Sequence, residues 1–196
     1  MKFFSRVAAM VLVMFLGVMG ASYAGTSPKT AIYKANKALG VDPNDAKAYY
    51  NRGTAELELG DLEAAVADLT KTVSLEPKAS DAYFNRGLAN RLMKKNAEAE
   101  ADFSKAIELY ADKWSYYFER CNVRIVEGHF DGAVADGSQM IRIASDDAES
   151  YFMRGLAYHL KGDHDAGLVD AENALKFQSW NAHALRLKTE ILALKK

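Results

Sequence analysis

Few side chains in this chain of 196 residues combine the types and spacing that chemistry requires. The densest group runs from His159 to Asp165 and holds two histidines and two aspartates around Gly162. Imidazole and carboxylate groups bind divalent metals, but this spacing matches no metal-binding motif. A solvated polar turn between helices is therefore the favoured interpretation, and a metal site is the alternative.

The other candidates for catalysis are isolated along the chain. His129 and His183 stand alone, and Cys121 is the only cysteine, which excludes an intramolecular disulfide and a cysteine-based zinc cluster. The sequence has no glycine-rich phosphate loop and no serine in a nucleophile motif. We therefore expect no catalytic residue, no metal and no cofactor, and predict that the protein is not an enzyme.

The charge is close to balanced. There are 25 Lys and Arg residues against 26 Asp and Glu residues, a formal net charge of −1, and 49% of the residues are hydrophobic. A protein that holds nucleic acid through a broad basic face needs an excess of positive charge. The composition is that of a folded protein, and we expect no nucleic-acid partner.

The N-terminus has the features of an export signal. Lys2 and Arg6 precede an uncharged, mostly apolar run over residues 7–20, and Ser22 and Ala24 form a small-x-small end. The apolar run is shorter than the ~20 residues that span a bilayer. We predict a signal peptide over 1–24, cleaved after Ala24, and an exported protein that is periplasmic or secreted. The membrane would then meet only the signal peptide before cleavage; an uncleaved anchor is the alternative.

The rest of the chain repeats itself every 34 residues. Three columns are invariant over four copies, which run 46–79, 80–113, 114–147 and 148–181. The tyrosine column is Tyr49, Tyr83, Tyr117 and Tyr151; the arginine column is Arg52, Arg86, Arg120 and Arg154; the aspartate column is Asp68, Asp102, Asp136 and Asp170. A fourth column holds small residues at Gly53, Gly87, Cys121 and Gly155.

Each copy has the pattern of two helices. In the first, small and apolar residues recur at helical spacing over 48–59 and again over 62–75. Gly60 and Asp61 separate the two stretches, and Pro77 ends the second. No stretch alternates as a β-strand does, so the sequence predicts an all-α protein built of antiparallel helix hairpins.

These residues resemble the tetratricopeptide repeat. The resemblance rests on the period, on Tyr49 and Gly53 of the first helix, and on Ala65, Leu69 and Pro77 of the second, with matching residues in later copies. It extends over about residues 29–196: residues 25–45 would be a linker and a half repeat with a second helix only, and residues 182–196 a capping helix. The resemblance implies an α-solenoid of ten helices wound as a right-handed superhelix.

The arginine and aspartate columns are always 16 residues apart. Folding each hairpin at its inner turn brings the guanidinium to the carboxylate of the same repeat. The favoured interpretation is a structural ion pair between the two helices, and the alternative is a ladder of charges for a ligand.

The third copy departs most from the pattern. Cys121 occupies the small-residue column, where we expect a buried side chain without reactivity. Gly137 is expected to make room for Met140 as a compensated change of volume.

The resemblance also implies a binding surface, because the first helices of such repeats line a concave groove. Aromatic residues recur in that position, accompanied by amides and apolar residues. Exposed rings among amides suit a peptide or a helix, and packing within the repeats is the alternative. The expected partner-binding residues are Tyr50, Asn51, Phe84, Asn85, Leu88, Arg91, Phe118, Asn122, Phe152 and Leu156.

The leading hypothesis is a non-catalytic scaffold in the cell envelope that binds another protein, a component of an envelope complex, in this groove. One alternative is binding of cell-wall polysaccharide, although Trp114 and Trp180 lie at repeat junctions, where we expect them to pack. The other is self-association into a homo-oligomer through the incomplete repeat at residues 29–39.

Overall fold

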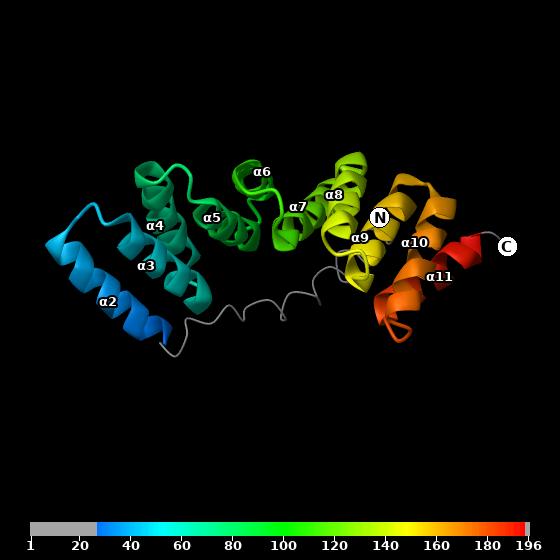
Figure 1. The fold of residues 1–196 in the computed structure, drawn as a ribbon, viewed down its shortest axis with the longest axis horizontal. Coiled ribbons are helices and arrows are strands. Elements are labelled where there is room, and N and C mark those ends of the chain that lie inside the picture. Colours follow the sequence, from blue (N-terminus) through cyan, green and yellow to red (C-terminus); the bar gives the residue numbers. More distant parts are fainter. Residues whose placement is uncertain (1–26, 195–196) are drawn as a thin grey trace. The chain divides into compact units, whose positions relative to one another are not determined.

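The computed structural model describes residues 27–194, so the predicted signal peptide over 1–24 lies outside the described residues. Within them the chain forms ten α-helices and no strand, which confirms the all-α fold (Figure 1). The helices are α2 (Pro28–Val41), α3 (Ala46–Leu59), α4 (Leu62–Leu75), α5 (Ser80–Leu92), α6 (Asn96–Leu109), α7 (Trp114–Glu127), α8 (Phe130–Ile143), α9 (Ala148–Lys161), α10 (His164–Phe177) and α11 (Ala182–Leu194).

The helices belong to two compact units, which divide after Leu109. In the first unit, α3 pairs with α4 and α5 with α6, and α2 packs on α3 in the place predicted for the half repeat. In the second unit, α7 pairs with α8 and α9 with α10, and α11 packs on the last pair in the place predicted for the cap. Within each unit, neighbouring hairpins therefore bury their faces by stacking on one another.

The inner turns end the first helix of each hairpin in a left-handed conformation. Gly60, Gly128 and Gly162 have φ of +82°, +80° and +99°. The same position of the second repeat holds Lys94, which adopts φ +61°. A side chain with a Cβ pays a steric cost there that glycine avoids.

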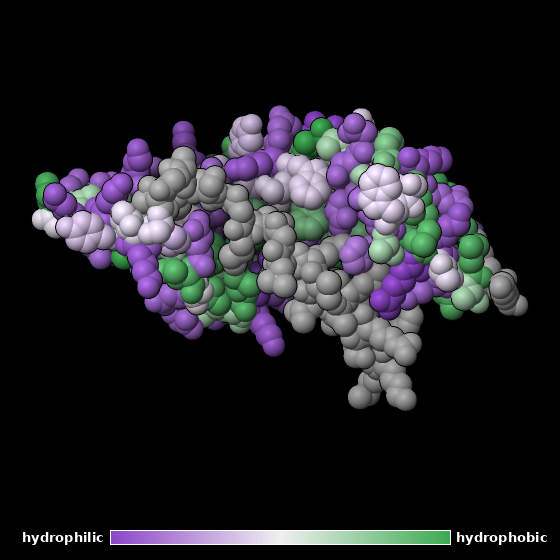
Figure 2. Space-filling view, turned by 90° about the horizontal axis from the view of Figure 1, so that it is seen from below, coloured by the Kyte–Doolittle hydropathy of each residue, from purple (hydrophilic) through white to green (hydrophobic). Residues whose placement is uncertain are grey.

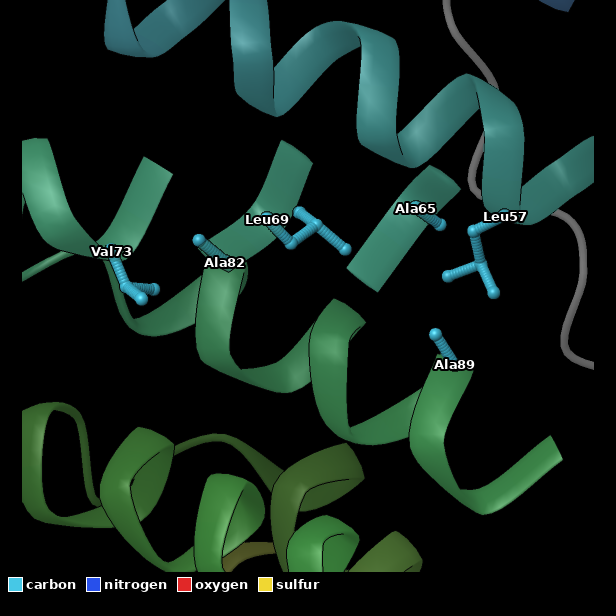
Figure 3. Packing of buried hydrophobic residues seen from close by; sticks show 6 residues of the cluster. All are labelled: Leu57, Ala65, Leu69, Val73, Ala82 and Ala89. Carbon is cyan, nitrogen blue, oxygen red and sulfur yellow. The ribbon is translucent and has the colours of Figure 1, made fainter. Parts of the chain in front are cut away.

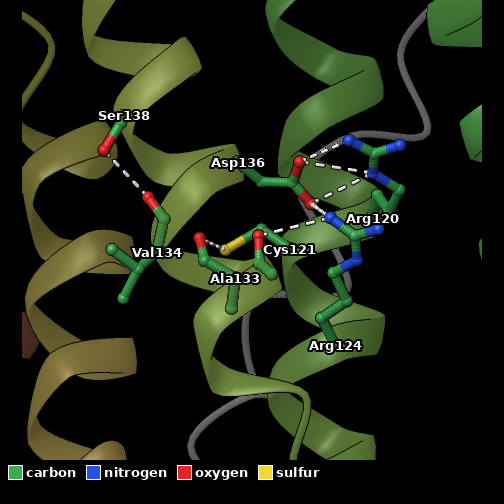
Figure 4. Close-up of polar contacts among 8 residues, drawn as sticks. Arg120, Cys121, Arg124, Ala133, Val134, Asp136 and Ser138 are labelled. Carbon is green, nitrogen blue, oxygen red and sulfur yellow. Dashed lines mark hydrogen bonds and ion pairs between the residues drawn. The ribbon is translucent and has the colours of Figure 1, made fainter.

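The small-residue column lets the two helices of a hairpin approach closely. A Cβ on Gly87 would lie 2.7 Å from a ring carbon of Phe103, and one on Gly53 would lie 3.0 Å from Leu69 Cγ. Cys121 takes this place in the third repeat; its side chain is fully buried and its thiol lies 3.4 Å from the carbonyl oxygen of Ala133 (Figure 4). The expectation of a buried, small cysteine is confirmed.

The core of the first unit lies between α3, α4 and α5 (Figure 3). Its alanines keep the three helices close, while the larger side chains fill the space between turns. The buried cluster consists of Leu57, Ala65, Leu69, Val73, Ala82 and Ala89.

The arginine and aspartate columns form ion pairs between the two helices of each hairpin, as predicted. In the second repeat, Arg86 Nε donates to Asp102 Oδ2 at 3.0 Å and Arg86 Nη2 to Asp102 Oδ1 at 2.6 Å. Such forked pairing is the strongest geometry for these groups. The aspartate is buried in every repeat. The exposed fractions of Asp68, Asp102, Asp136 and Asp170 are 7%, 6%, 1% and 2%.

The same guanidinium also reaches back to the preceding second helix. Arg86 Nη1 donates to Thr70 Oγ1 at 3.2 Å, and Arg154 Nη1 to Ser138 Oγ at 3.3 Å. In the first repeat the partner is Asn36, at 2.6 Å. One side chain thus joins three helices, a link that the sequence analysis did not identify although its acceptors also follow the 34-residue period.

Gly137, in the second helix of the third repeat, has a different neighbour from the one expected. A Cβ on Gly137 would lie 2.7 Å from Arg154 Cβ. Gly137 therefore makes room for the arginine of the following repeat, and the expectation that it accommodates Met140 is wrong.

Replacing Arg86 with Met should destabilise the first unit by about 2–3 kcal/mol, because the buried Asp102 loses its main partner. Asn90 Nδ2, 3.2 Å from Asp102 Oδ2, limits the loss. Urea unfolding followed by circular dichroism measures it. The control is Lys105→Met, which removes an exposed pair with Glu108 and should change the stability little; equal losses in the two variants would contradict the structural role.

Replacing Lys94 with Gly should stabilise the first unit by about 1 kcal/mol, because glycine adopts the positive φ without the Cβ penalty. Thermal unfolding of the variant measures the gain. Gly60→Ala at the matching turn is the control, and it should lower the melting temperature because it adds a Cβ at a positive φ. A lower melting temperature for Lys94→Gly would show that the lysine side chain, and not the backbone, decides the turn.

Candidate protein-binding surface

The predicted partner-binding residues lie on the first helices of the hairpins. In the first unit they come from α3 and α5, and all are partly exposed. Together with Thr54 they form what we call the α3–α5 face, which consists of Tyr50, Asn51, Thr54, Phe84, Asn85, Leu88 and Arg91. In the view of Figure 2, the described residues show hydrophilic side chains with apolar ones between them.

Hydrogen bonds hold the centre of the α3–α5 face in place. Asn85 Nδ2 donates to Tyr50 Oη at 3.3 Å and to Thr54 Oγ1 at 3.1 Å. Thr54 Oγ1 in turn donates to the carbonyl oxygen of Tyr50 at 2.9 Å. Burial, and then the charge of Asp81, raise the pKa of Tyr50, so the phenol stays protonated. The network fixes α3 against α5, and the sequence analysis had not placed Thr54 in it.

Apolar contacts support the rest of this face. Tyr50 and Leu88 pack against the buried cluster of the first unit. The ring of Phe84 lies 5.7 Å from that of Phe103 on α6, at an angle of 50°. The face therefore presents partly exposed rings with fixed orientation.

The expectation of exposed aromatic residues is wrong for the second unit. Phe118 and Phe152 are 9% and 1% exposed. Trp114 stacks on Phe118 at 4.8 Å, and His183 of α11 lies 5.6 Å from Phe152. Trp114 precedes Phe118 by one turn of α7, as a helical pattern predicts, whereas His183 belongs to α11 and no local pattern brings it to Phe152.

The predicted binding residues that flank these two rings, one an amide and one a leucine, are also buried. Asn122 is 7% exposed and Leu156 is 4% exposed. Among the predicted residues, the partly exposed ones are those of the α3–α5 face.

The two tryptophans differ in environment. Trp114 Nε1 donates to Ser150 Oγ at 2.7 Å, which joins α7 to α9. Trp180 is 78% exposed, so the expectation that it packs at a junction is wrong.

The histidine group at the turn between α9 and α10 is partly buried. His159 is 5% exposed, and its Nδ1 lies 3.0 Å from Nδ1 of His164. Burial, and then the neighbouring His164, lower the pKa of His159, which favours the neutral ring. The interpretation as a solvated turn is therefore wrong for His159. In the described part of the chain no group of three or more His, Cys, Asp or Glu residues could hold a metal ion.

In the first three repeats the buried aspartate has a further neighbour on the first helix, one turn after the arginine, and this neighbour differs between repeats. Arg124 Nη1 donates to Asp136 at 2.9 Å (Figure 4). In the first repeat the position holds Glu56, whose Oε1 lies 3.9 Å from Arg52 Nε. Burial, and then the charge of Asp68, raise the pKa of Glu56 to about 7. The first repeat therefore carries one carboxyl group, that of Glu56, with a pKa near neutrality.

Sequence comparison decides the family. The profile of the tetratricopeptide repeat matches residues 28–71 and 50–113, and a second profile of the same repeat matches residues 148–179. The chain belongs to the tetratricopeptide repeat family. The matches leave out residues 114–147, the copy in which Cys121, Gly137 and Met140 depart from the pattern.

Solved structures of other tetratricopeptide proteins share the fold. A crystal structure of MamA is 24% identical and has a TM-score of 0.75 over 86% of this chain and 98% of that chain. MamA of Desulfovibrio magneticus is 15% identical, with a TM-score of 0.72 over 92% of this chain and 96% of that chain. PilF of Pseudomonas aeruginosa is 22% identical, with a TM-score of 0.69 over 83% of this chain and 74% of that chain. No curated protein matches the sequence significantly.

None of the tetratricopeptide helices within residues 27–194 is long and apolar enough to cross a membrane.

Replacing Glu56 with Gln should change how stability depends on pH. A carboxyl group with a pKa of about 7 in the folded protein and 4.5 when unperturbed binds more protons in the folded state. Glu56 therefore lowers the stability as the pH rises from about 4.5 to about 7, and the cost is complete above this window. After allowance for its partial exposure, Glu56→Gln should stabilise the protein at pH 8 by about 1 kcal/mol and leave it unchanged at pH 4.

Urea midpoints measured from pH 4 to 8 test this expectation. Glu63→Gln, at an exposed position of the neighbouring helix α4, is the control. The role of Glu56 would be refuted if both variants kept the wild-type pH profile.

Proposed function

We propose that this tetratricopeptide protein is a non-catalytic scaffold that holds a peptide or helix of a partner protein on the α3–α5 face. The observation that carries the proposal is the hydrogen-bonded core of this face, in which Asn85 bonds to Tyr50 and Thr54. Rings and amides that are already fixed lose little entropy when a partner binds. Large aromatic side chains and arginine are also the residues that supply most binding energy in interfaces.

The composition of the face suits a peptide with both apolar and polar groups. Phe84 and Leu88 are partly exposed apolar side chains, and Asn51 and Arg91 are partly exposed polar ones. Protein interfaces are enriched in aromatic residues and arginine and combine apolar contacts with hydrogen bonds.

The place of action that we propose is the cell envelope, with an envelope component as partner. This part rests on the basic start, the apolar run over 7–20 and the small residues before position 25. Export to the periplasm or to the exterior would bring the α3–α5 face to partners of that compartment.

Self-association is a second candidate, favoured by the outer side of α11. Leu185 and Leu192 lie seven residues apart on this helix, and they are 55% and 41% exposed. Two exposed leucines two turns apart form an apolar stripe that a second copy could cover.

Site-specific photo-cross-linking in cells tests the proposal. A benzoyl-phenylalanine in place of Phe84 should form a discrete adduct with a partner protein, because this ring lies on the α3–α5 face. The matched control replaces Phe177 of α10, an aromatic residue that is 49% exposed and outside this face. Asn51→Ala combined with Arg91→Ala should reduce the Phe84 adduct at least about fivefold, as loss of interface anchors does.

The outcome against the proposal is equally definite. Equal adducts from the Phe84 and Phe177 positions, or an adduct that the double change leaves intact, would show that the α3–α5 face is not the binding surface.

A further inference from the structure

A cavity of about 340 Å³ lies at the first end of the chain, between α2 and α3. Its floor is made of small side chains, which are Ala31, Ala35, Ala38 and Ala48. Lys34 and Lys47 stand at its rim, both exposed, and neither forms an ion pair with another described residue. We call this cavity the α2–α3 slot. Its volume is at the low end of the range of about 300–1,000 Å³ for ligand pockets.

The equivalent surface in the next repeat shows which element packs at this position. Thirty-four residues later, Ala65, Asp68 and Leu69 occupy the positions of Ala31, Lys34 and Ala35. There the surface is covered by α3, since a Cβ on Gly53 would lie 3.0 Å from Leu69 and 3.1 Å from Asp68. The slot is thus the seat of a first helix, and no helix within residues 27–194 occupies it.

The charge at this seat is reversed. In the four complete repeats the second helix offers a buried aspartate, and the first helix brings an arginine to it. In the half repeat the aspartate position holds Lys34. A helix that docks in the slot must therefore carry an acidic residue where the other first helices carry arginine, and Lys47 adds a second positive charge at the rim. The rim carboxylate of Asp45 is engaged, because it accepts a hydrogen bond from the backbone N–H of Ala48 at 2.9 Å.

The size of the seat follows that of the complete repeats. Ala35 stands where the first two complete repeats have Leu69 and Phe103, and the last repeat has an alanine there too, Ala171. Even beside Ala171, a Cβ on the facing Gly155 would lie 3.1 Å from the carbonyl oxygen of Gly167. A docked helix therefore needs a small residue at the position after the acid.

Two occupants from this chain fail the charge requirement. By the register, residues 12–25 would supply the first helix and would place Val18 opposite Lys34; residues 1–27 contain no Asp or Glu. A second copy could offer α11, but its residue in the arginine column is Lys188, which would face Lys34 with like charge.

We propose that the α2–α3 slot binds an acidic amphipathic helix of a partner protein, which completes the half repeat. A carboxylate of that helix pairs with Lys34, and the next residue, a small one, lies against Ala35. The slot shares Asn51 with the α3–α5 face, but the proposal does not depend on the function assigned to that face.

Two peptides that copy a first helix of this chain probe the slot. Both have the sequence of residues 80–92, in which Gly87 supplies the small residue; one carries Arg86→Glu and the other keeps Arg86. A lactam bridge on the outer face keeps these short peptides helical. Fluorescence anisotropy is measured with residues 25–196, the chain expected after cleavage. The Glu peptide should bind about tenfold more tightly than the Arg peptide, because Lys34 attracts the first and repels the second.

A charge swap supplies the matched control. Lys34→Asp restores the aspartate of the other repeats at an exposed position, so the fold should be unaffected. This variant should reverse the preference, with the Arg peptide about tenfold tighter than the Glu peptide. Phe84→Ser on the α3–α5 face should leave both affinities unchanged, which separates failure of this proposal from failure of the proposed function.

Three results would overturn the proposal. The first is absence of binding by both peptides up to about 1 mM. The second is equal affinity for the Glu and Arg peptides, and the third is a preference that Lys34→Asp does not reverse. Occupation of the slot by a second copy would give the first of these results.

Discussion

Within each unit the stack depends on an arginine whose guanidinium faces two second helices. Its Nε and Nη2 bond to the aspartate of the same hairpin, as in Arg86 with Asp102 at 3.0 and 2.6 Å, and its Nη1 reaches the preceding second helix, as in Arg86 with Thr70 at 3.2 Å. A buried carboxylate is costly unless it is paired and hydrogen-bonded. The same side chain that satisfies the aspartate therefore also sets the distance and register between neighbouring hairpins of one unit.

The repeats differ in the residues that surround this arginine–aspartate pair. One turn after the arginine, the second repeat has Asn90 and the third has Arg124, each of which donates to the buried aspartate, whereas the first has Glu56. The two ends depart more strongly, because Lys34 replaces an aspartate and Lys188 replaces an arginine. Lys188 still pairs backward with Glu172 at 2.9 Å, so the last helix keeps its link to the preceding repeat. Lys34 has no such pairing with any residue between 27 and 194, and this makes α2 chemically distinct from α11.

Much of the fold could be predicted because it follows from local periodicity. The small column, with Gly87 against Phe103, and the arginine and aspartate columns are constrained by contacts within one hairpin, and each constraint recurs every 34 residues. The candidate site was harder, because exposure depends on contacts outside the hairpin. Phe84 and Phe152 occupy the same column, yet Phe84 is partly exposed while Phe152 is 1% exposed beside His183 of the capping helix.

By itself, the sequence determined the all-α class, the hairpins, the ion pairs and the burial of Cys121, since a repeated pattern reports the contacts that every repeat must make. Only the tertiary structure decided which aromatic rings are covered, that Gly137 accommodates Arg154, and that the arginine column also bonds to the preceding repeat. The structure also showed that the half repeat leaves an open seat beside α3. These features arise between neighbouring hairpins and at the end of the stack, where a side chain meets residues that its own repeat does not specify.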